Sequence, residues 1–212
     1  MRYKGIIFDL DGVITSSDRY HYLAWKKIAD ALGIAFDETV NNRLRGVSRM
    51  KSLDIILEAY PGTLTEREKQ AYAEKKNTFY RELLREHMSE KDLSREVKDT
   101  IDAIREKGLR MAIGSSSKNA KLILSRLGLD DYFDAVSDGT NITHSKPDPE
   151  VFLKASAYLH LEPEVCLVVE DAEAGIRAAQ AGHMDSAAIG DAVRYAIATY
   201  NLDTFSDLLK IV

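Results

Sequence analysis

The stretch Ile6–Ile14, which reads IIFDLDGVI, decides the fold because an apolar run typical of a buried strand ends in two carboxylates spaced two residues apart. Side chains two apart on a strand share a face, so Asp9 and Asp11 can address one ligand just beyond the carboxyl end of the strand. Gly12 permits a tight exit from that strand. Taken alone, the pattern is also typical of a turn or of a cap on the next helix, and it leaves both interpretations open.

Three later segments place polar residues where a parallel strand would adjoin a loop. Ser115–Asn119 (SSSKN) follows an apolar run, Lys146 precedes an expected helix, and Glu170–Asp171 ends a second apolar run. In an open α/β sheet, ligands bind beyond the carboxyl ends of the strands, so these segments should converge with Asp9 and Asp11. Carboxylates next to a lysine and hydroxyls suit Mg2+ placed between the acids and a phosphoryl group.

The periodicity of the chain predicts a helical region inserted into an α/β core. Apolar residues recur at helical spacing to about residue 88, whereas short Val-, Ile- and Ala-rich runs alternate with helices from Glu96 onward. This alternation predicts βαβ units, and hence a doubly wound parallel sheet of the Rossmann type formed by residues 1–15 and 92–212. An α-helical cap at 16–91 would shield the substrate from water. The later strands are expected at 109–113, 135–136, 165–169 and 186–189.

The order of these motifs resembles the haloacid dehalogenase (HAD) superfamily of aspartyl phosphotransferases, and the resemblance covers essentially the whole chain. Its superfamily motifs are the DxDG of Asp9–Gly12, Ser115 after a strand, Lys146-Pro147 and Glu170-Asp171. Within that superfamily the chain is most similar to the β-phosphoglucomutase-like subfamily. This similarity lies in FDLDGVIT at 8–15, YH with AW at 20–25, GVSR at 46–49, SSSKN at 115–119 and SKP at 145–147.

Chemistry and resemblance together assign catalytic roles to four residues. Asp9 is expected to be the nucleophile that carries the phosphoryl group as an acyl phosphate. Asp11 would act as general acid and then as general base on the sugar oxygen. Ser115, with neighbouring backbone N–H groups, would hold the phosphoryl oxygens, and Lys146 would neutralise their charge.

The resemblance also implies a Mg2+ site. The metal would take a carboxylate oxygen of Asp9, the backbone carbonyl of Asp11 and the carboxylate of Asp171, with Glu170 nearby or bound through water. Capping of the following helix remains the alternative for Glu170 and Asp171. The serine-rich run at 115–119 can likewise be only a helix cap.

The resemblance implies further residues that bind the substrate. Ser117 and Asn119 would face a second phosphate, and Arg49 could hold it with a bidentate contact. His21 and Lys76 resemble positions near the site, although each could instead serve local structure, as could Trp25 by helix packing. The full expected set is His21, Trp25, Gly46, Val47, Ser48, Arg49, Lys76, Ser116, Ser117, Lys118 and Asn119.

The composition is typical of an enzyme acting on a small molecule. The 212 residues are 45% hydrophobic and 30% charged, and no apolar stretch is long enough to span a bilayer. The net charge of -5 argues against nucleic acid as a partner. Cys166, the one cysteine, excludes an intrachain disulfide. We expect a cytoplasmic monomer whose partner is a sugar phosphate.

Asp9 and Asp11, together with His21 and the segment 46–49, lead to the hypothesis of a Mg2+-dependent mutase. It would convert β-glucose 1-phosphate to glucose 6-phosphate through a sugar 1,6-bisphosphate, which also primes the enzyme. The nearest alternative is a sugar-phosphate phosphatase of the same superfamily, in which water takes the phosphoryl group. A phospho-acceptor signalling module is a remote alternative, and the inserted cap argues against it. Ser16-Ser17 and the segment Glu90–Ser94 depart from the subfamily pattern, which bears on the hinge and on the sugar preference.

Overall fold

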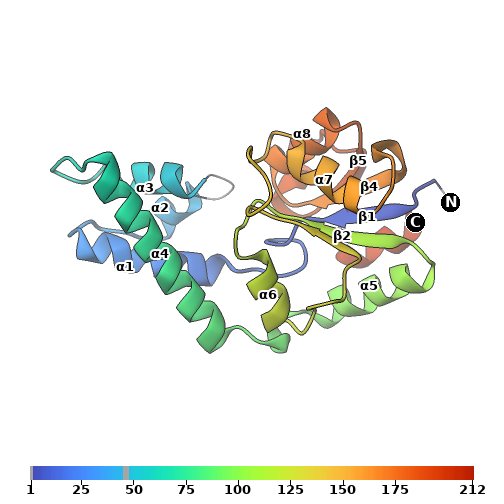
Figure 1. Cartoon of the computed structure of the whole chain (residues 1–212), viewed down its shortest axis with the longest axis horizontal. Helices are drawn as coiled ribbons and strands as arrows, with labels where there is room; N and C mark the ends of the chain where they lie inside the picture. Colours follow the sequence, from blue (N-terminus) through green and yellow to red (C-terminus); the bar gives the residue numbers. More distant parts are fainter. Residues whose placement is uncertain (1, 45–47) are drawn as a thin grey trace. The chain divides into compact units, whose positions relative to one another are not determined.

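The computed structural model describes residues 2–44 and 48–212, which form two compact units. The core unit comprises 1–16 and 89–212, and the helical unit comprises 17–88. Where the chain leaves and re-enters the core unit, the two segments are joined because Oγ1 of Thr15 donates to the carbonyl of Asp92 at 3.0 Å. The α/β core with an inserted helical domain that the sequence predicts is confirmed (Figure 1).

A parallel sheet organises the core unit, and its first strand lies in the middle. Within the described residues the sheet has six strands in the order β3-β2-β1-β4-β5-β6, and all neighbours are parallel. The chain fills one side of β1 and then the other, so a topological switch point lies at β1, where such sheets bind ligands. The strands are β1 Gly5–Phe8, β2 Arg110–Gly114, β3 Ala135–Ser137, β4 Cys166–Glu170, β5 Asp185–Ala188 and β6 Tyr200–Asn201.

Helices cover both faces of the sheet, which explains why the central strands are nearly all apolar. Figure 1 shows α7 and α8 over one face and α5 and α6 over the other. On the first face, Ile7 and Val168 of neighbouring strands pack with Phe152 of α7 and Ala178 of α8, and all four are fully buried. These helices are α5 Arg95–Glu106, α6 Ala120–Arg126, α7 Glu150–Tyr158 and α8 Glu173–Ala181.

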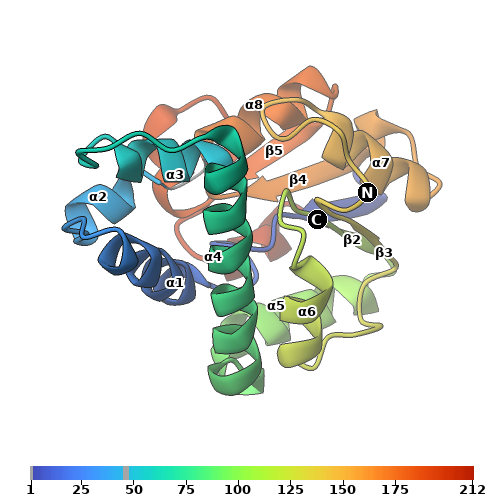
Figure 2. The ribbon, with the colours of Figure 1, turned by 60° about the vertical axis from the view of Figure 1, so that its left-hand side comes forward.

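The helical unit has its own apolar core. Helix α4 packs against α1 and α3, and it begins with a capping box in which Thr65 and Glu68 satisfy each other's backbone N–H groups (Figure 2). Trp25 and Ile28 of α1 pack with Leu53 of α3 in the interior. The helices are α1 Asp18–Ala31, α2 Glu38–Asn42, α3 Arg49–Leu57 and α4 Glu66–His87.

The expected strands differ from the observed ones mainly at their ends. The sequence places the second strand at 109–113, and the structure places β2 at Arg110–Gly114. Strand β6 was not predicted, because a two-residue edge strand has no detectable periodicity. No helix in the described part of the chain is both long and apolar enough to span a membrane. The monomeric state and the cytoplasmic location stay predictions.

Candidate active site

The two aspartates that open the site lie in the loop after β1. The strand ends at Phe8, so the strand alternation that the sequence suggests does not set the directions of Asp9 and Asp11. The N–H of Asp9 continues the sheet pairing by donating to the carbonyl of Val169 at 2.9 Å. Gly12 then adopts a φ of +90°, which favours glycine, and the loop turns sharply beyond the carboxyl end of the strand.

Lys146 links two of the predicted acidic residues. Its Nζ donates to Oδ1 of Asp9 and to Oε1 of Glu170, the latter at 2.6 Å. The side chains of Lys146, Asp9 and Glu170 are only 9%, 11% and 2% exposed. The ammonium also lies 4.6 Å from the ring centroid of Phe152. The structure therefore brings together residues that come from the ends of β1 and β4 and from the loop before α7.

Burial and mutual attraction set the charges of this group. Burial raises the pKa of Asp9, Lys146 counteracts that effect, and the carboxylates of Glu170 and Asp171 add to it. Burial by itself would lower the pKa of Lys146, but the attraction of Asp9 and Glu170 outweighs burial and raises it. Lys146 is therefore a permanent positive charge at the end of β1.

The same residues fit a hard divalent cation. When ionised, Asp9, Glu170 and Asp171 bring three negative charges to the point where Lys146 brings one positive charge. Gly12 makes room for the carboxylate of Asp171, because a Cβ at Gly12 would lie 2.0 Å from its Oδ2. Carboxylate oxygens beside a backbone loop are the ligands that Mg2+ prefers.

Glu170 is held in place by contacts that the sequence did not reveal. Its Oε2 accepts the N–H of Ala172 at 2.9 Å, and Ala172 is the N-cap of α8 without a side-chain cap. Glu170 therefore satisfies a backbone N–H at the start of α8, as the capping alternative expects, while its Oε1 binds Lys146. Gly175 gives Glu170 its space, since a Cβ there would lie 1.9 Å from Oε1 of Glu170. A glycine inside a helical pattern is the sequence signal for such a close approach.

The serine-rich loop after β2 forms two successive local turns. The Oγ of Ser115 accepts the N–H of Ser117 at 3.1 Å, and the Oγ of Ser117 accepts the N–H of Asn119 at 3.2 Å. Ser115 and Asn119 are buried, whereas Lys118 is exposed. Asn119 is the N-cap of α6 and its own side chain makes no capping bond, whereas Ser117 accepts the N–H of this N-cap residue. The Oγ of Ser116 is buried without a hydrogen-bond partner.

In the helical unit, His21 and Lys76 form one cluster. Nζ of Lys76 donates to Nδ1 of His21 at 2.7 Å and lies 5.1 Å from the ring centroid of Trp25. Tyr80, which the sequence did not indicate as a site residue, also belongs to this cluster. Its ring centroid lies 4.2 Å from that of His21 and 4.5 Å from Nζ of Lys76. Burial lowers the pKa of His21, and the positive charges of Lys76 and Arg49 lower it further. His21 is therefore neutral and can accept a hydrogen bond.

Arg49 begins helix α3 at the edge of this cluster. Its NH2 donates to Oδ1 of Asn77 at 3.0 Å, and burial lowers the pKa of the guanidinium. Ser48 is the N-cap of α3, where its side chain accepts the N–H of Lys51. The other two members of the expected substrate loop, Gly46 and Val47, lie outside the described residues.

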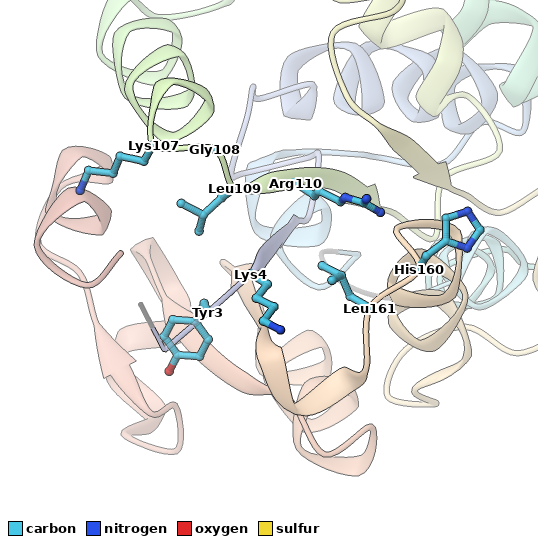
Figure 3. A pocket seen from close by; sticks show the side chains of 8 residues that line it. All are labelled: Tyr3, Lys4, Lys107, Gly108, Leu109, Arg110, His160 and Leu161. Carbon is cyan, nitrogen blue, oxygen red and sulfur yellow. The ribbon is translucent and has the colours of Figure 1, made fainter.

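A depression of about 470 Å³ lies at the opposite, amino edge of the sheet (Figure 3). It is lined by Tyr3–Lys4, Lys107–Arg110 and His160–Leu161. The side chains of Lys107 and Arg110 donate to the backbone carbonyls of Leu209 and Leu159. Their charged groups thus help to hold the chain together at this edge, away from the aspartates.

Comparison with known proteins finds relatives along most of the chain. Residues 3–183 match the haloacid dehalogenase-like hydrolase family. A β-phosphoglucomutase of Bacillus subtilis (strain 168) is 40% identical over 190 residues, which cover 88% of this chain and 83% of that relative. A fructose-1-phosphate phosphatase of Escherichia coli (strain K12) is 32% identical, with 87% of this chain and 95% of the relative covered. The crystal structure of a β-phosphoglucomutase from Clostridium difficile matches with a TM-score of 0.87 at 36% identity, covering 97% of this chain and 93% of that one.

Proposed function

We propose that this chain, which belongs to the haloacid dehalogenase-like hydrolase family, transfers a phosphoryl group of a sugar phosphate through Asp9. The resemblance to this family and to its β-phosphoglucomutase-like members, read from the sequence, is confirmed. The observation that carries the proposal is the ammonium of Lys146, which is held between the buried carboxylates of Asp9 and Glu170. The carboxylate of Asp9 can attack phosphorus, and the ammonium of Lys146 can stabilise the negative charge on the oxygens of the transferring group.

The chemistry follows from these positions. A carboxylate oxygen of Asp9 forms a bond to phosphorus while the bond from phosphorus to the sugar oxygen breaks. Asp11 gives its proton to the departing oxygen. In the second step the oxygen of an acceptor hydroxyl forms a bond to phosphorus while the bond from phosphorus to Asp9 breaks, and Asp11 takes the proton of that hydroxyl. Lys146 neutralises the oxygens of the transferring group, and Ser115 holds them with nearby backbone N–H groups. Bound Mg2+ would add positive charge at the same oxygens.

We propose further that the enzyme is a β-phosphoglucomutase that uses a sugar 1,6-bisphosphate. A mutase must hold a second, unreactive phosphate, and the helical unit offers Arg49 and Lys76 for that purpose. The guanidinium of Arg49 can make a bidentate contact with a phosphate. The name of the Bacillus subtilis relative, at 40% identity, supports the same substrate.

A sugar-phosphate phosphatase is the second candidate, and one finding favours it. The Escherichia coli relative, 32% identical over nearly its whole length, is named as a fructose-1-phosphate phosphatase. The same four residues would serve that reaction, with water in place of the second sugar hydroxyl. The two activities differ in what accepts the phosphoryl group from Asp9.

The deciding experiment incubates the protein with Mg2+, β-glucose 1-phosphate and a catalytic amount of β-glucose 1,6-bisphosphate. Glucose 6-phosphate and inorganic phosphate are measured in parallel, and Asp9→Asn serves as the nearly isosteric control. We expect glucose 6-phosphate without matching phosphate release, and loss of both signals in Asp9→Asn.

Other outcomes lead to different conclusions. Phosphate release at turnover rates would identify a phosphatase. If neither glucose 6-phosphate nor inorganic phosphate forms, other sugar phosphates should be tested as substrates. Full activity in Asp9→Asn would refute the assignment of the nucleophile. Stable phosphorylation of Asp9 without turnover would support the signalling alternative.

A further inference from the structure

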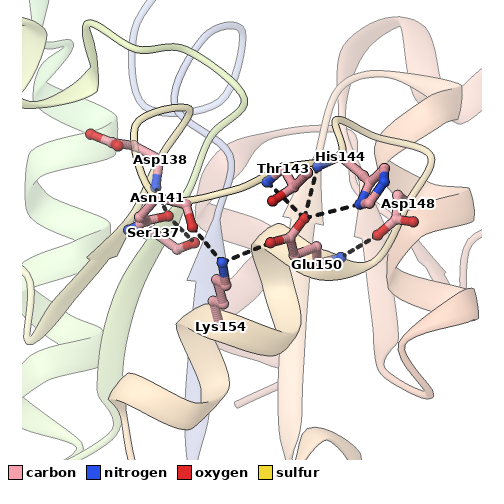
Figure 4. A network of polar contacts seen from close by, with 8 residues as sticks. All are labelled: Ser137, Asp138, Asn141, Thr143, His144, Asp148, Glu150 and Lys154. Atoms are coloured by element: carbon pink, nitrogen blue, oxygen red, sulfur yellow. Dashed lines mark hydrogen bonds and ion pairs between the residues drawn. The ribbon is translucent and has the colours of Figure 1, made fainter.

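Lys146 lies in a tight turn, and both ends of that turn are hydrogen-bonded to Glu150, the first residue of α7 (Figure 4). At the start of the turn, Oε2 of Glu150 accepts the N–H groups of Thr143 at 2.9 Å and His144 at 2.8 Å. At its end, the N–H of Glu150 donates to Oδ1 of Asp148 at 2.9 Å. One residue therefore fixes the chain on either side of Lys146.

Lys154 extends these contacts one helical turn further along α7. Its Nζ donates to Oε1 of Glu150 at 2.7 Å and to the backbone carbonyl of Asn141. Oδ1 of Asn141 accepts in turn from the Oγ of Ser137 and the N–H of Asp138, both at 3.2 Å. The network runs unbroken from the end of β3 to the turn that carries Lys146 (Figure 4).

The serine-rich loop after β2 contacts the end of β3, where this network begins. The N–H of Ser115 donates to the carbonyl of Ser137 at 3.0 Å. A Cβ at Gly139 would lie 2.4 Å from the carbonyl oxygen of Ser116, so the segment after β3 lies directly against that loop. The end of β3 therefore adjoins both groups that are assigned to the phosphoryl oxygens, the Ser115 loop and the Lys146 turn.

Both carboxylate oxygens of Glu150 accept hydrogen bonds in this network, and these bonds favour the ionised form of Glu150. The side chain is 20% exposed, and that of Lys154 is 36% exposed. The hydrogen bond from Lys154, followed by those from the N–H groups of His144 and Thr143, lowers the pKa of Glu150 to about 2. Glu150 is therefore ionised throughout the pH range in which such enzymes work.

We propose that Glu150 and Lys154 are positioning residues, which hold the turn so that the ammonium of Lys146 stays between Asp9 and Glu170 during phosphoryl transfer. Neither residue needs to touch the substrate. The inference rests on the proposed function, since it assigns Lys146 to the reaction. A catalytic group displaced by about 1 Å can lower the rate roughly 100-fold, so small movements of this turn matter.

The test compares variants that remove different parts of the network. Glu150→Ala removes the acceptor for Thr143, His144 and Lys154, whereas Glu150→Gln keeps an oxygen for the N–H groups and loses the ion pair. Lys154→Met removes the ion pair and the hydrogen bond to the carbonyl of Asn141, while the carboxylate of Glu150 still accepts the N–H groups of Thr143 and His144. The matched control is Lys98→Met, which breaks an ion pair of the same i,i+4 spacing on α5.

Turnover and exchange are measured for each variant. We expect Glu150→Ala to lower kcat about 10- to 100-fold with KM changed less than about threefold, because the turn moves while the substrate-binding groups stay. Glu150→Gln should recover part of that loss, and Lys98→Met should stay within about twofold of the wild type. Amide hydrogen exchange at 143–148 should accelerate in Glu150→Ala and not in Lys98→Met.

A double-mutant cycle separates positioning from a general structural effect. If Glu150 acts through Lys146, Glu150→Ala should have no further effect on the residual activity of Lys146→Met. An equal loss in both backgrounds, or unchanged exchange at 143–148, would overturn the proposal. If Lys146→Met has no measurable activity, the exchange result decides.

The two proposals fail in different ways. A wild type without phosphoryl transfer would refute the proposed function, while the exchange measurement would still show whether Glu150 fixes the turn. An active wild type in which Glu150→Ala leaves kcat unchanged would refute the positioning role alone.

Discussion

Replacing Lys146 with methionine should destabilise the core unit by about 3–5 kcal/mol at pH 7.5 without divalent cations, because two buried carboxylates lose their ammonium partner. The side chains of Asp9 and Glu170 are 11% and 2% exposed, so water cannot replace the lost contact. Glu170 keeps one hydrogen bond, from the N–H of Ala172. Methionine has nearly the length of lysine, which limits the loss from packing.

The destabilisation should shrink as the pH falls. Burial already raises the pKa of Asp9, and removal of Lys146, which lowers it, raises that pKa further. A carboxyl whose folded pKa is raised stabilises the folded state below its unfolded pKa, near 4, and that contribution is lost as pH rises through the folded pKa. At pH 5 we therefore expect a loss of about 1–3 kcal/mol, the cost of a neutral buried group without a partner.

Amide hydrogen exchange in β1 and β4, corrected for its intrinsic pH dependence, measures the opening free energy of the core unit. The fluorescence of Trp25, the one tryptophan, reports urea unfolding of the helical unit. The midpoint of that transition should be the same in Lys146→Met and in the wild type. Lys98→Met, which breaks a half-exposed pair, should cost only about 0–1 kcal/mol. A loss below about 1 kcal/mol for Lys146→Met at pH 7.5, or one that grows toward pH 5, would refute the reasoning.

Three further substitutions have defined outcomes. Gly12→Ala places a Cβ 2.0 Å from Oδ2 of Asp171 at a φ of +90°, so the carboxylate of Asp171 must move. Calorimetry should therefore show the affinity for Mg2+ lowered about 10- to 100-fold. An unchanged affinity would contradict the metal site. Thr65→Ala removes the N-cap of α4 and should lower the free energy of urea unfolding of the helical unit by about 1 kcal/mol. Lys76→Met removes a positive charge that, after burial, lowers the pKa of His21, so an NMR titration should show that pKa rising. An unchanged pKa would refute the contribution of Lys76 and leave burial and Arg49 as its causes.

The arrangement of the sheet could be predicted because its signals are local. Strands buried on both faces read as continuous apolar runs, and helices alternate with them. Polar residues at the ends of such runs must lie at one edge of a parallel sheet, which is why Asp9 and Glu170 lie near each other at the ends of neighbouring strands. The exact end of β1 was not predictable, since it depends on pairing with β2 and β4 rather than on the residues of β1.

The finer contacts of the candidate site could not be read from the sequence. Lys76 and His21 are 55 positions apart, and their contact depends on how α1 and α4 pack. Glu150 and Lys154 resemble an ordinary ion pair on a helix surface, with the usual spacing of four. Their link to the Lys146 turn depends on backbone N–H groups, which every residue except proline carries and which no residue pattern distinguishes.

The hydrogen bond between Thr15 and the carbonyl of Asp92 brings together the two points at which the chain leaves and re-enters the core unit. The inserted helices therefore begin and end next to a contact that is made within the core unit itself. A change in the length or sequence of these helices leaves the strands of the sheet, Asp9 and Lys146 uninterrupted in the chain. Under the proposed function, the groups assigned to phosphoryl transfer and Arg49, assigned to the second phosphate, are encoded in separate stretches of the gene.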